Sequence, residues 1–202
     1  MENEVVRASI KIVILGDSGV GKSSIIAQYN TGIMPDLMSP TVGASYLSKI
    51  IEFENNEIEL RFWDTAGQET YQSLVPIYFR NSSIAFIVFD ITQRSTYENT
   101  QKWLSQLREF AGNNILVCLV ANKIDLENQR EIEKSEYAEF AGRNQMIYTE
   151  VSAKTGVGIN SMIENAVETF VKTNNDFQYE MYMSRRKMEQ KLVNNTFSLS
   201  CC

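Results

Sequence analysis

The segment that most constrains this chain is the run from Gly16 to Ser23, which reads Gly-Asp-Ser-Gly-Val-Gly-Lys-Ser. It fills every fixed position of the phosphate-binding loop pattern and lies between an apolar run, residues 10–15, and an amphipathic stretch, residues 21–30. Its glycines let the backbone turn tightly, so that successive N–H groups point inward at a helix N-terminus and bind an anion. The motif predicts a nucleoside triphosphate site and leaves the base open. The alternative is a glycine-rich turn with an incidental lysine.

The polar groups of this loop have expected roles. Lys22 would place a full positive charge beside the β- and γ-phosphates, and the Ser23 hydroxyl would be an oxygen ligand of Mg²⁺. Phosphate contacts are predicted for Ser18, Gly19, Val20, Gly21, Lys22, Ser23 and Ser24.

Apolar runs and amphipathic stretches alternate along the chain. The apolar runs 84–91, 115–121 and 146–151 are followed by stretches with helical spacing at 95–110, 132–143 and 159–172. Strand then helix, repeated, is typical of a parallel sheet covered by helices on both faces. Residues 46–63 instead partly alternate polar and apolar side chains on either side of Asn55 and Asn56, which predicts a hairpin. We expect an α/β, doubly wound domain whose six-stranded sheet is mostly parallel with one antiparallel edge pair.

Composition excludes several functions. The 202 residues include 19 Lys and Arg against 25 Asp and Glu, and the net charge of −6 disfavours binding to nucleic acid. The absence of histidine removes the usual proton shuttle and the commonest transition-metal ligand. No secretory signal pattern precedes the loop, and no apolar run approaches the roughly 20 residues that span a bilayer. We expect a cytosolic, reduced protein in which Cys118, inside an apolar run, is a core thiol.

Three further segments resemble those of small GTPases of the P-loop class. They are Trp63-Asp64-Thr65-Ala66-Gly67-Gln68-Glu69, Asn122-Lys123-Ile124-Asp125 and Ser152-Ala153-Lys154, in this order after the phosphate loop. The resemblance implies that Asp64 holds Mg²⁺ through water and that Gly67 contacts the phosphates. It also implies that Gln68 is the catalytic residue, which orients the attacking water.

The same resemblance implies a guanine base. Guanine offers N1–H and N2–H₂ donors, which one carboxylate, that of Asp125, can accept together, whereas adenine offers no such pair. Asn122 would reach the base edge or brace the loops, Lys123 would lie along the ring, and Ala153 would donate its N–H to guanine O6. The predicted base-binding residues of the two segments are Asn122, Lys123, Asp125, Ser152, Ala153 and Lys154.

The branch that the chain resembles most is the Rab family of vesicle-traffic GTPases, over about residues 8–172. Val42-Gly43-Ala44-Ser45-Tyr46 and Tyr78-Phe79-Arg80 are similar to its switch segments. The stretch Ser73-Leu74-x-Pro76-x-Tyr78 resembles both the early-endosomal and the Golgi-retrograde subgroups, so the subgroup stays open. The resemblance implies a GTP/GDP switch in which Thr41 ligates Mg²⁺ and binds the γ-phosphate. Tyr46, Trp63 and Tyr78 would form an aromatic patch that effectors recognise, with ordinary packing across the hairpin as the alternative.

Hydrolysis in such a protein proceeds by positioning and charge stabilisation, at about 10⁻⁴ to 10⁻² s⁻¹ without an activating partner. The resemblance implies an exchange factor, a GTPase-activating protein and effectors as partners of a monomer. Two rival functions remain, a P-loop kinase of small molecules and a nucleotide-loaded scaffold that scarcely hydrolyses GTP.

The chain departs from the Rab pattern in three places. Met34 stands where a phenylalanine usually lies against guanine, so nucleotide would leave several-fold faster than is typical. Thr70 replaces an arginine, which puts in doubt which exchange factors and activators fit, and Asn81-Ser82 replaces Gly-Ala and affects packing. Pro35 and Asp36, next to Met34, are predicted to lie near the sugar and base.

After residue 172 the composition becomes polar and Asn-rich without a steady period, which predicts a flexible tail over 173–202 behind a domain at 8–172. Cys201-Cys202 resembles the double-cysteine ending of Rab proteins, where both thiols carry geranylgeranyl groups, and stable anchoring needs two chains. The resemblance implies a prenyl-transfer escort and a GDP-dissociation inhibitor as partners. The protein would be cytoplasmic and bind reversibly to the cytosolic face of endosome, Golgi or vesicle membranes.

Overall fold

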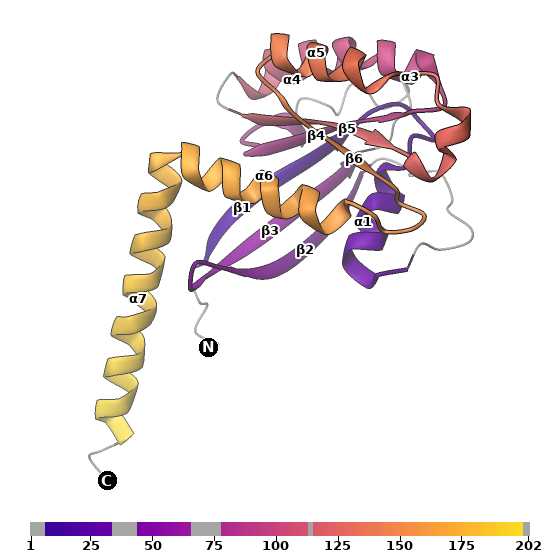
Figure 1. Cartoon of the computed structure of the whole chain (residues 1–202). Coiled ribbons are helices and arrows are strands. Elements are labelled where there is room, and N and C mark those ends of the chain that lie inside the picture. Colours follow the sequence, from indigo (N-terminus) through magenta and orange to yellow (C-terminus); the bar gives the residue numbers. More distant parts are fainter. Residues whose placement is uncertain (1–6, 34–43, 66–77, 113–114, 200–202) are drawn as a thin grey trace.

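A six-stranded sheet with strand order β2-β3-β1-β4-β5-β6 forms the centre of the molecule (Figure 1). The computed structural model describes residues 7–33, 44–65, 78–112 and 115–199. Strand β2 pairs antiparallel with β3 at one edge, and every other pair in the sheet is parallel. The predicted fold class is therefore confirmed. The strands are β1 Ala8–Leu15, β2 Ala44–Phe53, β3 Asn56–Thr65, β4 Ile84–Asp90, β5 Leu116–Asn122 and β6 Ile147–Val151.

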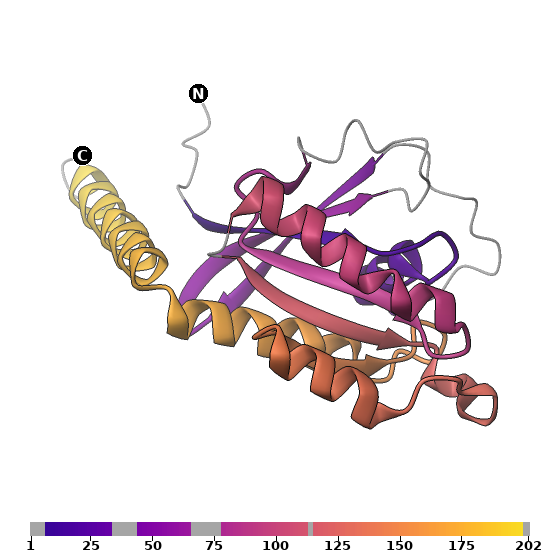
Figure 2. The same ribbon diagram turned by 90° about the horizontal axis from the view of Figure 1, so that it is seen from above.

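Helices cover both faces of the sheet (Figures 1 and 2). Side chains of β1 alternate between two cores, because successive residues of a strand point to opposite faces. Ile12 lies with helices α1 and α6, whereas Val13 lies with α4 and α5. The described helices are α1 Lys22–Thr31, α3 Arg94–Glu98, α4 Thr100–Ala111, the 3₁₀ helix η2 Ile124–Gln129, α5 Lys134–Arg143, α6 Ile159–Thr173 and α7 Asn175–Leu199.

Strands β2 and β3 are joined by a two-residue turn. Glu54 and Asn55 both have positive φ, 48° and 61°, and Phe53 pairs with Asn56. Two positive φ angles are the geometry of the hairpin turn that twists with its strands, and Asn tolerates it well. The hairpin prediction is confirmed, with the turn one residue earlier than the Asn55-Asn56 pair on which it was centred.

Cys118 lies inside β5 with 1% of its surface exposed. Burial raises the pKa of its thiol, so the thiolate does not form in the physiological range. The predicted role as a core thiol is confirmed.

The chain beyond Thr173, where the sequence analysis predicts a flexible tail, forms helix α7 over Asn175–Leu199. Asn174 caps this helix by accepting the Phe177 N–H at 2.9 Å, and the Phe177 ring packs on Phe170 with centroids 5.2 Å apart. Phe177, Met181 and Ser184 are buried, one helical turn after another. These three positions are too few to stand out as a periodic pattern in the sequence. The domain boundary at residue 172 remains a prediction.

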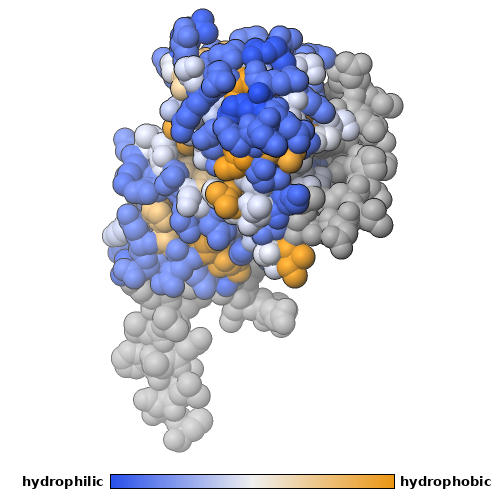
Figure 3. Space-filling model, turned by 45° about the vertical axis from the view of Figure 1, so that its right-hand side comes forward, coloured by the Kyte–Doolittle hydropathy of each residue, from blue (hydrophilic) through white to orange (hydrophobic). Residues whose placement is uncertain are grey.

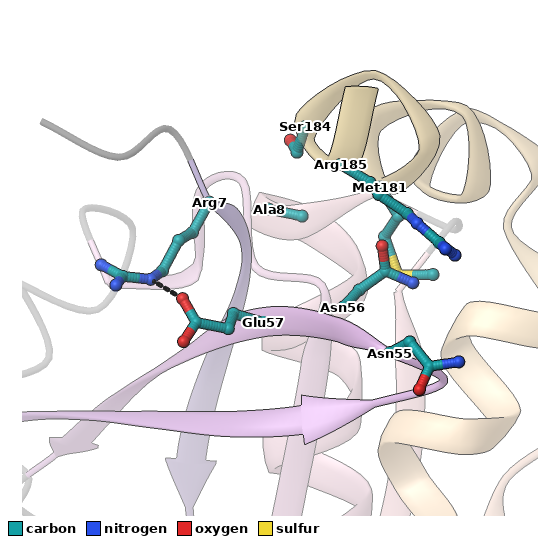
Figure 4. Close-up of a pocket in the computed structure, with 8 residues that line it drawn as sticks. All are labelled: Arg7, Ala8, Asn55, Asn56, Glu57, Met181, Ser184 and Arg185. Atoms are coloured by element: carbon teal, nitrogen blue, oxygen red, sulfur yellow. Dashed lines mark hydrogen bonds and ion pairs between the residues drawn. The ribbon is translucent and has the colours of Figure 1, made fainter. Parts of the chain in front are cut away.

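A pocket lies where α7 meets the hairpin (Figure 4). Met181, Ser184 and Arg185 line it from α7, and Arg7 turns toward Glu57, to which it is bonded at 2.6 Å. Glu57 lies at the start of β3, and the predicted metal-binding residue Asp64 lies near its end, so this pocket is remote from the predicted site. The other lining residues are Ala8, Asn55 and Asn56.

One face of the molecule is mostly hydrophilic (Figure 3). Figure 3 shows one face on which hydrophobic residues form small, separated spots among hydrophilic ones. Among the helices of the described ranges, none combines the length and apolar character needed to cross a bilayer.

Candidate nucleotide-binding site

The phosphate loop lies between the end of β1 and the start of α1, and its backbone requires glycine. Gly16, Gly19 and Gly21 have φ angles of 135°, 80° and 96°, a region that L side chains rarely adopt. A Cβ on Gly16 would lie 2.2 Å from the Val88 carbonyl oxygen, so β4 fixes the first turn. A Cβ on Gly19 would meet nothing within 4 Å. The loop is therefore packed against the sheet at its base and open at Gly19, where an anion would have room.

Lys22 is held over this loop by the loop's own backbone. Its Nζ donates to the carbonyl oxygens of Gly16, at 2.8 Å, and Asp17, at 2.7 Å, and the residue is only 6% exposed. Burial lowers its pKa to about 8, although the nearby carboxylates of Asp64 and Asp17 act to raise it. A bound phosphate would supply the negative charge that this partly desolvated ammonium favours.

Ser23 and Asp64 bring a hydroxyl and a carboxylate together beside the loop. The Ser23 hydroxyl donates to Asp64 Oδ2, and the Ser45 hydroxyl reaches the same oxygen at 3.5 Å. Asp64 is 2% exposed, and the hairpin register places Ser45 opposite it. Ser45 belongs to the predicted switch segment, but its proximity to Asp64 was not anticipated, because it depends on the register of β2 against β3.

This donor set fits Mg²⁺. Hard oxygen ligands suit that ion, which usually takes one or two protein groups and completes its shell with phosphates and water. Across the described part of the chain, no group of three or more His, Cys, Asp or Glu side chains is placed to hold a metal by itself. Ser23 and Asp64 would bind the ion here, and its contribution would be to neutralise charge on the phosphate oxygens.

Asn122 joins the phosphate loop to the loop after β6. Its Nδ2 donates to the Val20 carbonyl oxygen at 2.8 Å, and its Oδ1 accepts the Ala153 N–H at 3.1 Å. The residue is 1% exposed, so both bonds lie away from water. Of the two roles predicted for Asn122, the bracing of loops is what the structure contains. With guanine bound, the Ala153 N–H would donate to both Asn122 Oδ1 and guanine O6.

Lys123 is anchored by a carboxylate that the sequence analysis missed. It has a φ of 70°, and its Nζ lies 2.6 Å from Oδ2 of the buried Asp90 at the end of β4. The other Asp90 oxygen accepts the backbone N–H and the hydroxyl of Thr92, at 2.9 and 2.7 Å. Asp90 thus fixes the direction of the Lys123 stem. An acidic residue that ends an apolar strand, as Asp90 does, was the available signal.

Asp125 is exposed at the start of η2, and one of its carboxylate oxygens accepts a hydrogen bond. Its Oδ1 accepts from the Ser152 hydroxyl at 2.6 Å, and the same hydroxyl oxygen accepts the Thr155 N–H at 3.1 Å. Ser152 is fully buried, so the two predicted base-binding segments are bonded directly to each other. Lys154 lies exposed beside them.

Asp17, a variable position of the loop motif, links the loop to α4. Its Oδ1 accepts from Trp103 Nε1 at 2.8 Å, and its Oδ2 accepts from Asn99 Nδ2 at 2.7 Å. The role of Asp17 was missed, because its partners lie more than 80 positions away in the sequence.

The three predicted patch aromatics are in contact. The Tyr46 and Trp63 rings lie 5.2 Å apart edge to face, and the Trp63 and Tyr78 rings lie 5.8 Å apart. Lys11 Nζ lies 5.3 Å from the Trp63 ring, and Tyr46 is 52% exposed. This geometry agrees with packing across the hairpin and also presents an aromatic surface, so both alternatives stand.

The departure at Asn81 has a backbone explanation. Asn81 has a φ of 58°, a left-handed conformation in which glycine is easiest and asparagine is the next best tolerated. Ser82 is buried and donates its hydroxyl to the Tyr78 carbonyl oxygen at 3.2 Å. The pair therefore fits the turn before β4.

Several predicted residues lie outside the described ranges. They are Met34, Pro35, Asp36, Thr41, Gly67, Gln68, Thr70, Cys201 and Cys202. Their predicted roles stay predictions.

The site brings together a lysine-bearing phosphate loop, a strand-end carboxylate beside a serine hydroxyl, and two loops braced on a buried asparagine. This arrangement at the carboxyl ends of parallel strands defines a P-loop nucleotide-binding domain.

Comparison with known proteins places the domain in a family. A family model described as the Ras family matches residues 11–172. The chain is 37% identical over 153 residues to Ras-related protein Rab-22A of Homo sapiens, covering 76% of this chain and 79% of that protein. It is 38% identical over 160 residues to the GTP-binding protein ypt5 of Schizosaccharomyces pombe, covering 78% and 76%. With Ras-related protein Rab-18-B of Danio rerio it shares 37% identity over 174 residues, 86% and 84% of the two chains.

The chain belongs to the Rab family of small GTPases, and the enzyme class of that family is GTP hydrolase.

Proposed function

We propose that this protein is a Mg²⁺-dependent GTP/GDP switch that regulates vesicle-mediated membrane traffic. The observation that supports it best is the buried bridge through Asn122 from Val20 to Ala153. It ties the loop that would hold the phosphates to the loop that would hold the base, so that a single nucleotide engages both. The bond between Ser152 and Asp125 sets beside this bridge the carboxylate that would accept the guanine donors.

The metal would be held by Ser23 and Thr41 directly and by Asp64 through water. Asp64 and Ser23 are already in contact, which supports this assignment. Thr41 would ligate the metal only while the γ-phosphate is present, so that loss of that phosphate releases the segment. This change would be the switch that effectors read through Tyr46, Trp63 and Tyr78.

Hydrolysis would be slow. Gln68 would orient the attacking water, and no covalent enzyme intermediate is needed. The rate would be on the order of 10⁻⁴ to 10⁻² s⁻¹ alone, and the arginine finger of an activating protein would raise it by about 10³ to 10⁵-fold. An exchange factor would accelerate the opposite half of the cycle.

Attachment to membranes would use lipid on Cys201 and Cys202. Two prenyl chains give stable anchoring where one gives marginal binding. A prenyl-transfer escort and a GDP-dissociation inhibitor would then handle the lipidated form, and the protein would cycle between cytosol and the cytosolic face of endosomal, Golgi or vesicle membranes. The similarity to both Rab-22A and Rab-18-B leaves the organelle open.

The base assignment is tested by the release of fluorescent GDP in Mg²⁺, chased with excess GTP or with excess ATP. Competition by GTP alone is the expected result, and Met34→Phe should slow release several-fold by restoring an aromatic contact to the base. Equal competition by ATP would overturn the guanine assignment and favour the P-loop kinase.

The hydrolysis assignment is tested separately by single-turnover GTP cleavage with and without an activating protein. A slow intrinsic rate that depends on Gln68 is expected. A rate that Gln68→Leu leaves unchanged, and that no activator raises, would favour a scaffold that scarcely hydrolyses GTP.

A further inference from the structure

An ion cluster adjoins the two base-binding segments. At its centre is Glu150, on β6, two residues before Ser152. The Glu150 carboxylate accepts from the Tyr137 hydroxyl, from Arg130 Nη2 at 2.8 Å and from Lys134 Nζ at 3.3 Å. Three donors from outside β6 therefore converge on the strand that leads into the Ser152 loop.

Arg130 connects this cluster to Asp125. It follows η2 directly, and η2 begins one residue before Asp125. The guanidinium forms a fork with Glu127 of η2, with distances of 2.8 and 2.7 Å, and also donates to the Ile132 carbonyl oxygen at 3.1 Å. With the 2.8 Å bond to Glu150, this one planar group joins η2 to β6.

The helix η2 needs such support. It is a 3₁₀ helix of six residues, and Leu126 within it has the non-helical angles φ −101° and ψ 35°. Helices of this kind have poor hydrogen-bond geometry and rarely persist alone. Arg130 has a side-chain exposure of 11%, so it is the less exposed partner of its pair with Glu127, whose side chain is 66% exposed.

The surroundings of Glu150 and Arg130 favour their charged forms. Burial acts to raise the pKa of Glu150, but hydrogen bonds from Tyr137, Arg130 and Lys134 outweigh burial and lower it. The hydrogen bond to Glu127 raises the pKa of Arg130. An opposite-charge pair that is partly buried and well bonded holds its geometry, and removal of one partner leaves the other charge unpaired.

We propose that Arg130, Glu150 and Tyr137 form an outer clamp that positions Asp125 and thereby determines discrimination for guanine over bases that lack the 2-amino group. The clamp joins η2 to β6 through Arg130 and Glu150, and the bond between Ser152 and Asp125 joins η2 to the residue that follows β6. The three residues are positioning residues, because they act on the base through Asp125. This inference rests on the proposed guanine site.

The test compares release rates of fluorescent GDP and fluorescent inosine diphosphate in Mg²⁺. Inosine diphosphate keeps N1–H but lacks the 2-amino donor, so only one of the two hydrogen bonds to Asp125 remains. Wild-type protein is expected to release it about tenfold faster than GDP, as expected for the loss of one hydrogen bond to a charged group. Glu150→Gln and Arg130→Met should speed GDP release and bring the ratio of the two rates toward one.

The ratio separates positioning from general loosening. A site that is merely weakened releases both nucleotides faster by the same factor, and the ratio stays at its wild-type value. Arg130→Lys keeps the charge but loses the fork, so it should also lower the ratio. Glu139→Gln is the matched control, because it removes the same charge from an exposed pair with Arg143 on α5 and should leave both rates unchanged.

Failure of the proposed guanine site and failure of the clamp alone give different results. A wild-type ratio near one would overturn the assignment of Asp125 to the 2-amino group, and the clamp with it. A wild-type ratio near ten that persists in Glu150→Gln and Arg130→Met would overturn the clamp alone. Tyr137→Phe removes only the hydroxyl, which bonds to Glu150 and also interacts with Arg130. It takes the place of either variant whose thermal unfolding shows a lost fold, and an unchanged ratio there also counts against the clamp.

Discussion

Gly21 lies against the side chain of Asn122, so closely that a Cβ on Gly21 would come within 2.3 Å of the amide nitrogen. That nitrogen donates to the Val20 carbonyl oxygen in a buried bond, so it has no easy direction in which to move. The glycine of the phosphate loop and the asparagine of the base segment therefore determine each other's position.

Gly21→Ala should accelerate GDP release about tenfold or more. The substitution displaces Asn122 from Val20, at a cost of about 1–3 kcal/mol for the buried groups left unpaired. It also places an alanine at a φ of 96°. Gly32→Ala is the control, because Gly32 has a φ of 71° but open space around its missing Cβ. Equal acceleration by the two variants in a stopped-flow release experiment would contradict the role of Asn122.

The lowered pKa of Lys22 predicts that the protein takes up a proton when nucleotide binds. Burial lowers this pKa from 10.5 to about 8, and bound phosphates would raise it again. GDP affinity should therefore fall as pH rises through about 8, and calorimetry at pH 8.5 in two buffers of different ionisation enthalpy should show the uptake. Lys172→Met, which removes an exposed lysine, should leave it unchanged. Absence of uptake would show that the lysine stays charged without phosphate.

The same pKa has a consequence for stability. Between pH 8 and 10.5 the unfolded chain holds a proton on Lys22 that the nucleotide-free folded protein has released. The unfolded state then binds more protons, so the contribution of Lys22 to the free energy of unfolding rises with pH across this window. Urea unfolding of nucleotide-free protein at pH 7.5 and 9, with Lys22→Met as reference, measures it. A reference-corrected contribution that falls with pH would contradict the lowered pKa.

Asp90→Asn should release GDP several-fold faster with little loss of fold. The amide oxygen can still accept from Thr92, but Lys123 loses the carboxylate that lies 2.6 Å from its Nζ. Glu168→Gln removes a carboxylate from the exposed pair with Lys172 and should leave release unchanged. The result that would count against this role is a normal release rate in Asp90→Asn with a lowered melting temperature.

Phe177→Ala should lower the free energy of unfolding by about 3–5 kcal/mol, the usual cost of removing a buried ring. Phe177 is 5% exposed and packs on Phe170, so the loss would show that α7 belongs to the folded core. Tyr179→Ala, two residues away and 64% exposed, should change stability little. If both variants unfold like wild type in urea, α7 is not part of the cooperative unit.

The sheet and the site were predictable where local sequence patterns determine them. Apolar runs that alternate with amphipathic stretches located β1, β4, β5 and β6, and the spacing of Gly16, Lys22 and Ser23 located the phosphate loop. These features depend on neighbours in the sequence.

Contacts between distant segments were not predictable in the same way. Asp17 occupies a position that the loop motif leaves free, and its partners Trp103 and Asn99 become neighbours only after β1 and β4 pair. Asp90 likewise acquires its role from Lys123, which directly follows the neighbouring strand β5. The packing of α7 depends on three separated residues, which composition alone does not distinguish from a polar tail.

Helix α7 also fixes the distance between its two ends. Its 25 residues, at 1.5 Å for each residue, span about 37 Å. A flexible chain of the same size would have a root-mean-square span of about 25–30 Å and would sample all shorter distances. Because α7 begins packed against the core, its far end is held at a distance from the nucleotide site that the helix determines. The two ends of α7 are therefore kept apart by the full length of the helix, whereas a flexible tail would let them approach each other.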